Sequence, residues 1–581
     1  MKIYIKSFKS ISDGQYVALG KKLTFLVGPN SAGKSVVAHA LEHLKGNDPC
    51  FDPDARLQYY NPIGDRVAAV QSLGLEWQDG DDLIEYRSTI VDGAHFGDYL
   101  SHVAEIHNDQ LVCKEYEQDN VRFGNPRRVI TRIISNVVVS ASVFDAKDSG
   151  VTRYKRGDNF RTNLHTSHPG YVDWNVEAIH VSSLGKDRKK LEAAYRWLLE
   201  LWSEAARDED WAADIAGFEA LWGEGYFHWQ PEFIFQLIRG RFDGAKRQGW
   251  LNQFGHHDAA IKKVLDEIDG RFRMGFPGGQ FDVALVSANR VLPTDAEVNG
   301  CVSTLRLPEN PYQDLMRSFL ANEWGLDWYG GCDDRADRSF EKKEGRIVSY
   351  WPAEKRWSVI VTASEAGVLA VAVNKALAED LFIDNGYQIG VSSTLRVKRK
   401  DLVNVTHVEV YRKGGQTWFP HDEFLFDAQL HLRDAHGRQL NFSEVGSGIG
   451  YVLPVLIECF RQRNTRKVVF IQQPELHLHP ALQAALCDVL INAAKDRMIV
   501  SETHSEHLIL RALKRIRQTF NGTLVDEELR LHPEDVAVNY FEPQADGSTK
   551  VYVLRIAPDG DFIDRWPDGF FPERDRELFD E

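Results

Sequence analysis

A run of eight residues near the N-terminus has the types and spacing of a phosphate-binding loop, GxxxxGK(S/T). The run is Gly28, Pro29, Asn30, Ser31, Ala32, Gly33, Lys34 and Ser35. Glycine at the two fixed positions lets the backbone turn so that successive N–H groups face phosphate oxygens. The lysine would reach the β- and γ-phosphates, and the serine hydroxyl would bind Mg²⁺. The pattern therefore predicts a nucleotide-binding site.

The segments on either side of this loop are the ones that the pattern requires. Leu23–Val27 is an apolar run that predicts a buried strand, and we expect a helix from Lys34 to about Leu44. The start of that helix adds its positive dipole end to the loop. This strand–loop–helix context favours phosphate binding over a chance glycine turn.

A second group of candidate residues lies near the other end of the chain. A loop of small residues precedes the helical segment YVLPVLIECFRQR, and its candidate ligands are Ser443, Gly446, Ser447 and Gly448. Two apolar runs beyond it predict strands, Lys467–Ile471 and Met498–Val500. The residues that follow these strands are Gln472, Gln473 and Glu475 after the first and His504 after the second. A small-residue loop at a helix start can bind an anion, so these segments predict a second part of the nucleotide site.

The order of these motifs resembles the ATPase heads of ABC and SMC proteins. Within that superfamily, PELHLHP and ETHSEHLILRAL resemble the OLD-like (overcoming lysogenisation defect) and RecF-related AAA family ATPases of bacterial anti-phage systems. The ending WPDGFFPERDRELF resembles a tail of one such subgroup, and the segment 288–293, which contains Arg290, resembles an arginine loop of that subgroup. The resemblance implies an α/β fold, an ABC-type ATPase head of the P-loop class, with a mostly helical insertion.

The resemblance also implies a homodimer or higher homo-oligomer in which two heads enclose two molecules of ATP with Mg²⁺. Lys34 and Ser35 would hold the phosphates and the metal ion within one chain. Either Ser443 or Ser447, with the neighbouring glycines, would contact the ATP bound to the partner. His504 would sense the γ-phosphate. ATP binding would then shift the population toward the closed dimer.

The end of the first distal strand departs from the usual pattern. Such heads carry an acidic residue for Mg²⁺ and then an acidic residue, or in some subgroups Gln, that activates water, whereas this chain has Gln472 and Gln473. An amide cannot accept a proton near neutral pH, and its oxygen is a weaker partner for Mg²⁺. We expect Ser35 and Gln472 at the metal. Hydrolysis is slow, or Glu475 serves as base or metal ligand, or the site is degenerate or engineered from an acidic parent.

Three other possibilities are weaker. His477, His479 and His504 would suit a metal, but no Cys or carboxylate has matching spacing. The basic runs 186–190 and 396–400 are typical of solvated faces, although either run could contact DNA, RNA or an acidic partner. Only the 77 residues 505–581 follow His504, and they contain no clear acidic metal cluster. A built-in toprim nuclease is therefore not expected.

The chain divides, by pattern, into four regions: 1–150, 151–280, 281–430 and 431–581. The first and last form the ATPase head, the second is a helical insertion, and the third is a mixed bridge with strands expected at 281–286, 357–362 and 402–411. The insertion is rich in tryptophan, with Trp174, Trp197, Trp202, Trp211, Trp222, Trp229 and Trp250. Packing inside the insertion is the simpler interpretation, and a partner-docking surface is the alternative.

Composition limits the class of protein. The net charge of −16 argues against a nucleic-acid coat over the whole chain. The six cysteines form no CxxC pair, which favours a reduced cytoplasmic chain over a disulfide framework. The N-terminus has no signal-peptide pattern, and no apolar run approaches the roughly 18 residues that cross a membrane.

Two functions remain. The favoured one is an ATP-gated switch or scaffold, the sensor or regulatory subunit of an anti-phage complex with a separate nuclease or toxin as effector. The alternative is a DNA-binding clamp of the SMC or RecF type, acting in DNA repair or in plasmid or phage DNA processing.

Overall fold

The computed structural model divides the chain into two compact units. The first comprises Met1–Leu19, Gly28–Asp282 and Asn539–Val553, and the second comprises Gly20–Val27, Val283–Val538 and Leu554–Glu581. The residues that the structure describes are 1–44, 70–91, 127–135, 137–145, 174–176, 179–180, 188–209, 211–212, 215, 226–227, 231–274, 282–290, 299–303, 311–324, 348–351, 356–360, 368–396, 416–419, 425–442, 445–461 and 467–566. Each unit is described by itself below.

The first unit is built on a seven-stranded antiparallel sheet with the order β2-β1-β4-β5-β6-β7-β8. Its strands are β1 (Lys2–Lys6), β2 (Gln15–Ala18), β4 (Val70–Asp79), β5 (Asp82–Val91), β6 (Arg127–Ile134), β7 (Val137–Asp145) and β8 (Trp174–Val176). Alternate side chains of β1 point inward, so Ile3 and Ile5 are fully buried. Helix α1 (Val36–His43) belongs to the same unit and buries Val37, Ala40 and Leu41.

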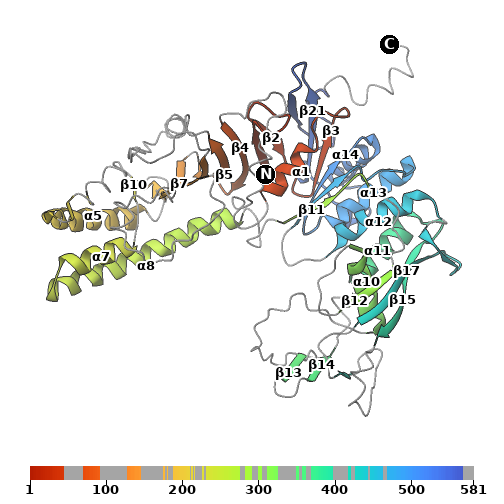
Figure 1. Ribbon diagram of the computed structural model, residues 1–581. Coiled ribbons are helices and arrows are strands. Elements are labelled where there is room, and N and C mark those ends of the chain that lie inside the picture. Colours follow the sequence, from red (N-terminus) through yellow and green to blue (C-terminus); the bar gives the residue numbers. More distant parts are fainter. Residues whose placement is uncertain are drawn as a thin grey trace. The chain divides into compact units, whose positions relative to one another are not determined.

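Three helices of the first unit pack against one another: α5 (Arg188–Ala205), α7 (Pro231–Arg241) and α8 (Gly244–Met274) (Figure 1). Trp197 and Trp202 are buried there, and Trp250 stacks on Phe242 with ring centroids 5.5 Å apart. Trp197 and Trp202 therefore lie in the interior of the helical region. Trp222 and Trp229 lie outside the described residues, so the interpretation of the whole insertion stays a prediction. A short pair of strands, β9 (Ile179–His180) and β10 (Tyr226–Phe227), also lies in this unit.

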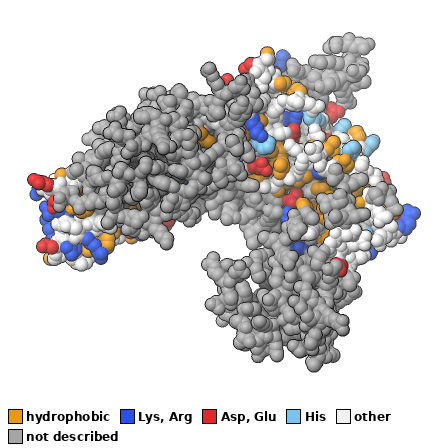
Figure 2. Space-filling view, viewed as in Figure 1, with side chains coloured by type: hydrophobic (Ala, Val, Ile, Leu, Met, Phe, Trp, Pro, Cys, Tyr) orange, Lys and Arg blue, Asp and Glu red, His pale blue; other side chains and the backbone are white. Residues whose placement is uncertain are grey.

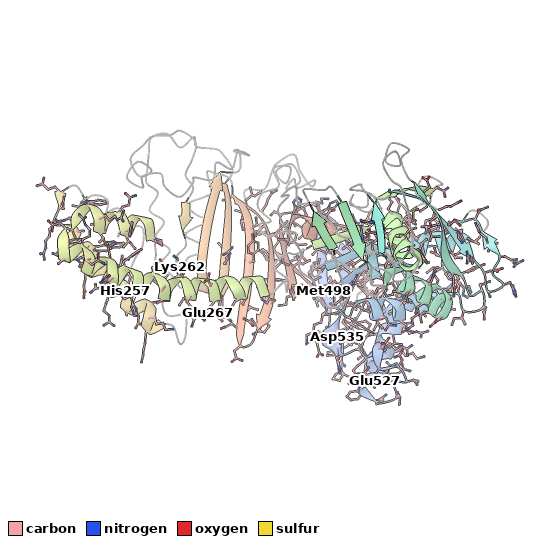
Figure 3. All side chains as sticks on the ribbon, turned by 90° about the horizontal axis from the view of Figure 1, so that it is seen from below. His257, Lys262, Glu267, Met498, Glu527 and Asp535 are labelled. Atoms are coloured by element: carbon pink, nitrogen blue, oxygen red, sulfur yellow. The ribbon has the colours of Figure 1, made fainter. Side chains whose placement is uncertain are left out.

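Helix α8 extends from the other two helices to the sheet of the same unit. Figure 3 labels His257, Lys262 and Glu267 along its length. Near its end, Arg271 bonds the carboxylates of Asp79 and Asp82, which border the turn between β4 and β5. At the opposite end of the three helices, acidic and basic side chains are mixed on the surface (Figure 2). That mixture is typical of a solvated face.

The second unit contributes most of a six-stranded sheet with the order β11-β19-β20-β3-β21-β22. Its strands are β3 (Leu23–Val27), β11 (Asp282–Val286), β19 (Lys467–Gln472), β20 (Met498–Glu502), β21 (Val536–Pro543) and β22 (Thr549–Leu554). The strands β19, β20 and β3 run parallel. All five residues of β3 are buried, as the apolar run predicts for a strand covered on both faces.

Helices follow the parallel strands, which makes this part of the chain α/β. They are α13 (Pro480–Ala493) after β19 and α14 (Glu506–Phe520) after β20, with α12 (Ser447–Phe460) preceding β19. Asp488 on α13 holds Arg511 and Arg515 on α14 through bonds of 2.7–2.9 Å. Because β19 and β20 are parallel and joined by α13, they form a βαβ unit, and the strands expected at Lys467–Ile471 and Met498–Val500 are confirmed.

The remainder of the second unit has two smaller antiparallel sheets and three helical segments. One sheet contains β12 (Asn299–Ser303), β15 (Gln388–Arg396), β17 (Leu425–Arg433) and β18 (Gln439–Leu440); the other contains β13 (Val348–Trp351), β14 (Arg356–Ile360) and β16 (Gln416–Phe419). The helical segments are α10 (Pro311–Trp324), α11 (Val368–Lys375) and the π-helical Ala376–Leu381. None of the helices that the structure describes combines the length and apolarity needed to cross a membrane.

The expected α/β fold with a strand–loop–helix phosphate motif is confirmed, and some local expectations need correction. Residues 1–27 form three strands, although the sequence pattern predicts two, because Gln15–Ala18 pairs with β1 and is too short and polar to stand out. Helix α1 begins at Val36 rather than at Lys34. The strand expected at 357–362 is β14, shifted by about one residue. The strand expected at 402–411 lies outside the described residues, and the four-region division stays a prediction.

Candidate nucleotide-binding site

The backbone of the loop Gly28–Ser35 has conformations that favour glycine at the two positions where the motif requires it. Gly28 has a φ of +140° and Gly33 a φ of +86°. A Cβ at Gly28 would lie 2.3 Å from the carbonyl oxygen of Phe541, which leaves no room for a side chain. Ser31 is also left-handed, with a φ of +62°. Alternation of such conformations makes the concave backbone that binds anions, so the loop has the form that phosphate binding requires.

Lys34 lies over its own loop. Its side chain is buried, and Nζ donates to the carbonyl oxygens of Gly28 at 3.0 Å and Pro29 at 2.7 Å. Pro29, Asn30 and Ser31, by contrast, are exposed. The positive charge is therefore held within the loop whose outer residues face solvent.

Ser35 occupies the N-cap position of α1 without using its side chain as the cap. The side-chain oxygen of a helix N-cap residue usually accepts a hydrogen bond from an N–H of the first helical turn. A serine hydroxyl at this position of the motif has the chemistry of a Mg²⁺ ligand. The phosphate loop and α1 together fit a triphosphate with Mg²⁺ by their donor chemistry.

The distal candidate residues gather at the carboxyl ends of β19 and β20. In this parallel pair Gln472 lies opposite Glu502, and the N–H of Gln473 donates to the Glu502 carbonyl oxygen at 2.7 Å. The Gln472 side chain accepts from the N–H of Ala288 at 3.1 Å and donates to a Glu502 carboxylate oxygen at 3.5 Å. Gln473 has a left-handed φ of +46°. The two glutamines are thus held in a tight turn, and Gln472 bonds the Glu502 carboxylate.

Arg290, on a neighbouring segment, stabilises this turn by hydrogen bonds. It follows β11, the strand beside β19, and its guanidinium donates to the carbonyl oxygens of Gln472 and Gln473, each at 2.7 Å. The side chain is buried, and this burial lowers the pKa of Arg290, whereas the negative charge of Glu475 acts to raise it. The arginine loop noted in the sequence therefore positions the two residues that replace the usual acidic pair.

Glu475 is the carboxylate most suited to proton transfer among the distal candidates. One oxygen accepts from the N–H of His504 at 2.7 Å, and the other is buried. Burial raises the pKa of Glu475, although the His504 N–H, the Thr503 side chain and the charge of Arg290 act in the opposite direction. A carboxyl group with a raised pKa in this setting is a candidate acid or base.

His504 and the small-residue loop present exposed groups. The His504 side chain is exposed after β20, while Ser505 caps α14. Gly446 and Ser447 are exposed at the start of α12, and a Cβ on Gly448 would lie 3.0 Å from the His477 carbonyl oxygen. The start of α12 therefore packs on the turn that follows β19. Ser443 lies outside the described residues.

The two other histidines of the turn have structural contacts. The His477 ring lies 4.4 Å from the ring of Tyr451, and His479 accepts from the N–H of Ala481 at the start of α13. In the part of the chain that the structure describes, no three His, Cys, Asp or Glu residues gather as a metal site.

The carboxyl ends of β20 and β3 lie side by side within the second unit. Leu26 of β3 lies opposite Glu502 of β20, and the N–H of Thr503 donates to the Leu26 carbonyl oxygen at 3.1 Å. Parallel strands end at one edge of a sheet, and ligands of α/β proteins bind outside that edge. Glu502, which sequence patterns did not single out, belongs to this edge because it is the last residue of β20.

Comparison with protein families matches three parts of the chain. Residues 1–123 match an AAA ATPase domain, and residues 380–511 match an AAA domain described as a putative AbiEii toxin of a type IV toxin–antitoxin system. Residues 531–580 match a family described as a protein of unknown function (DUF3696). The two ATPase families cover the segments that contain the phosphate loop and the β19–β20 edge. No curated protein matches the chain as a whole.

Solved structures similar to the chain include several SMC heads. The SMC head domain from Thermotoga maritima is 8% identical, with 96% of this chain and 98% of that chain covered and a TM-score of 0.34. An Smc head from Pyrococcus furiosus, bound to the C-terminal domain of ScpA, is 10% identical at 95% and 96% coverage with a TM-score of 0.30. TM-scores this low do not establish a shared fold. The phosphate loop and the two ATPase families support an ATP-binding ATPase with an α/β P-loop fold.

Proposed function

We propose that this chain is an ATP-gated switch that binds ATP at the Gly28–Ser35 loop, hydrolyses it slowly and acts through a separate protein. The observation that carries the proposal is the loop itself: two glycines in conformations that other residues rarely adopt, with the Lys34 ammonium group held inside the turn. A neutral structural turn would not need a buried lysine, because burial of a charge is costly unless it is paired.

ATP binding would exchange the partners of Lys34. Its Nζ now bonds two neutral carbonyl oxygens, and phosphate oxygens are stronger partners because they carry charge. Backbone N–H groups of the loop and the start of α1 would add to the binding. Mg²⁺ supplies charge neutralisation on the phosphates when bound, and Ser35 offers it a hydroxyl. The assignment of Ser35 and Gln472 as its ligands stays a prediction.

Slow hydrolysis follows from the chemistry of the β19 end. Gln472 and Gln473 can orient water but cannot take its proton. Glu475 supplies the missing base in this proposal, because it is a carboxyl group with a buried oxygen and a raised pKa beside the two glutamines. Its link to the backbone of His504 joins the base to the proposed γ-phosphate sensor. Glu502 offers a second carboxylate beside Gln472.

The switch would operate in a homodimer. We propose that Ser447 and its flanking glycines contact the partner's ATP, because they lie at the exposed start of α12. His504 is also exposed, at the end of β20. ATP held between two chains favours the closed dimer only by its differential affinity for that state. Slow hydrolysis would keep the closed state populated.

We further propose that the switch regulates an effector of an anti-phage system rather than DNA. The description of the family over residues 380–511 names a toxin of a toxin–antitoxin system, and the net charge of −16 disfavours general nucleic-acid binding. ATP-dependent retention of a protein encoded beside this chain is the expected result of a pull-down. An ATP-dependent gel shift of duplex DNA without any retained protein would favour the clamp instead.

Replacement of Lys34 by Ala is expected to weaken ATP binding roughly 100-fold, because contacts between an ammonium group and phosphate oxygens contribute a few kcal/mol. Isothermal titration calorimetry with ATP and Mg²⁺ measures this change. Lys21→Ala, which removes an exposed lysine of the same segment, is the matched control and should bind normally. Equal ATP affinity for Lys34→Ala and the natural chain would remove the phosphate loop from the proposal.

Replacement of Glu475 by Gln is expected to lower ATP turnover by about 10² to 10⁴-fold while ATP still binds. A base acts in its ionised form, so turnover in the natural chain should rise with pH through a pKa above the ordinary carboxyl range. This rise of turnover with pH should be absent from the Glu475→Gln variant. Turnover by phosphate release across pH measures both effects.

Glu527→Gln is the control for this substitution, because it removes an exposed carboxylate elsewhere in the second unit. Its turnover and pH profile should match those of the natural chain. If Glu475→Gln retains full turnover with the same pH profile, another group is the base.

A further inference from the structure

A hairpin near the C-terminus contacts the phosphate loop through a pair of hydroxyl groups. Thr549, the first residue of β22, is buried, and its Oγ1 lies 3.0 Å from the Ala32 carbonyl oxygen and 2.9 Å from the Ser10 hydroxyl. The Thr549 N–H also donates to the Ser10 carbonyl oxygen at 2.8 Å. All these residues belong to the first unit. The phosphate loop is therefore tied to two segments that are distant from it in sequence.

The Thr549 hydroxyl is the donor in both of these hydrogen bonds. A hydroxyl has one proton, and a carbonyl oxygen can only accept. The Thr549 proton is therefore shared between the Ala32 carbonyl oxygen and the Ser10 hydroxyl oxygen. Thr549 thus links Ser10 to the backbone of the phosphate loop.

The loop glycines sit against the same elements. A Cβ at Gly33 would lie 2.3 Å from the Ser10 hydroxyl oxygen and 2.7 Å from that of Thr549, and a Cβ at Gly28 would meet the backbone of Phe541 on β21. Both glycines are therefore required by close approach as well as by their φ angles. The conformation of the loop is shaped against the β21–β22 hairpin and Ser10.

Two buried or half-buried amides anchor the hairpin itself. Gln15 donates to the Thr549 carbonyl oxygen at 2.7 Å and accepts from the Val551 N–H at 2.6 Å. Asn539 is fully buried and bonds both the N–H and the carbonyl oxygen of Ala18, at 2.8 and 2.9 Å. Each amide satisfies two backbone groups, so the hairpin is held rigidly to β2.

We propose that Thr549 and Ser10 are positioning residues for ATP, and that the β21–β22 hairpin is the support that sets the phosphate loop. The proposal rests on ATP binding at that loop. N–H groups can converge on phosphate only if neighbouring carbonyl groups turn away. Lys34 holds the Gly28 and Pro29 carbonyl groups, and Thr549 holds that of Ala32. This assigns a role to part of the segment 531–580, whose matching family has none in its description.

The test compares three variants of the full chain. Thr549→Val keeps the shape but removes the hydroxyl, Thr549→Ser keeps the hydroxyl, and Ser548→Ala removes the neighbouring hydroxyl, which bonds Asp546 instead. Loss of the hydrogen bonds should weaken ATP binding roughly fivefold to tenfold in Thr549→Val. Thr549→Ser and Ser548→Ala should bind as the natural chain does. Calorimetry gives the affinity, and melting without nucleotide gives the stability.

Ser10→Ala provides a second measurement, because it removes the other acceptor of the Thr549 hydroxyl. Its effect on ATP affinity should not add to that of Thr549→Val in the double variant, since both act through the Thr549 hydroxyl. Unchanged ATP affinity in Thr549→Val, with or without a lower melting temperature, would overturn the positioning role, as would an equal loss in Ser548→Ala. A natural chain that does not bind ATP would overturn the proposed function as well.

Discussion

The phosphate loop depends on one constraint: its carbonyl groups must be turned away from the space that an anion would fill. Lys34 holds two of them and Thr549 holds a third. Gly28 and Gly33 adopt the backbone angles that result. The buried strand β3 and helix α1 fix the two ends of the loop. An anion site of this kind is built mainly from the backbone, so its strength depends on how rigidly the surrounding elements hold it.

The β19–β20 edge is held by contacts that involve the backbone of its two glutamines. The two glutamines occupy a turn held by Arg290 and by the backbone of Glu502. The turn is therefore maintained without a carboxylate at either position. Glu475 retains a carboxylate nearby, and its burial disfavours the charged form. The slow hydrolysis that we propose for this edge would favour long retention of ATP.

Local sequence patterns predict the parts of the site that contiguous residues determine. The phosphate loop is such a part, because strand, turn and helix are specified within about twenty residues. The environment of Glu475 depends on pairing between β19 and β20, and the role of Arg290 depends on β11 lying beside β19. Thr549 is 517 residues from Ala32 along the chain. No spacing rule predicts such a contact, because it arises only when the hairpin packs on the loop.

Hydrogen exchange of the natural chain, with and without ATP and Mg²⁺, tests the central claim most directly. Amide groups that bind phosphate exchange more slowly, since exchange requires the hydrogen bond to open. We expect ATP to slow exchange in residues 29–37 most strongly, with smaller protection in the β21–β22 hairpin and none in helix α8. Binding of ATP with unchanged exchange in residues 29–37 would contradict the account.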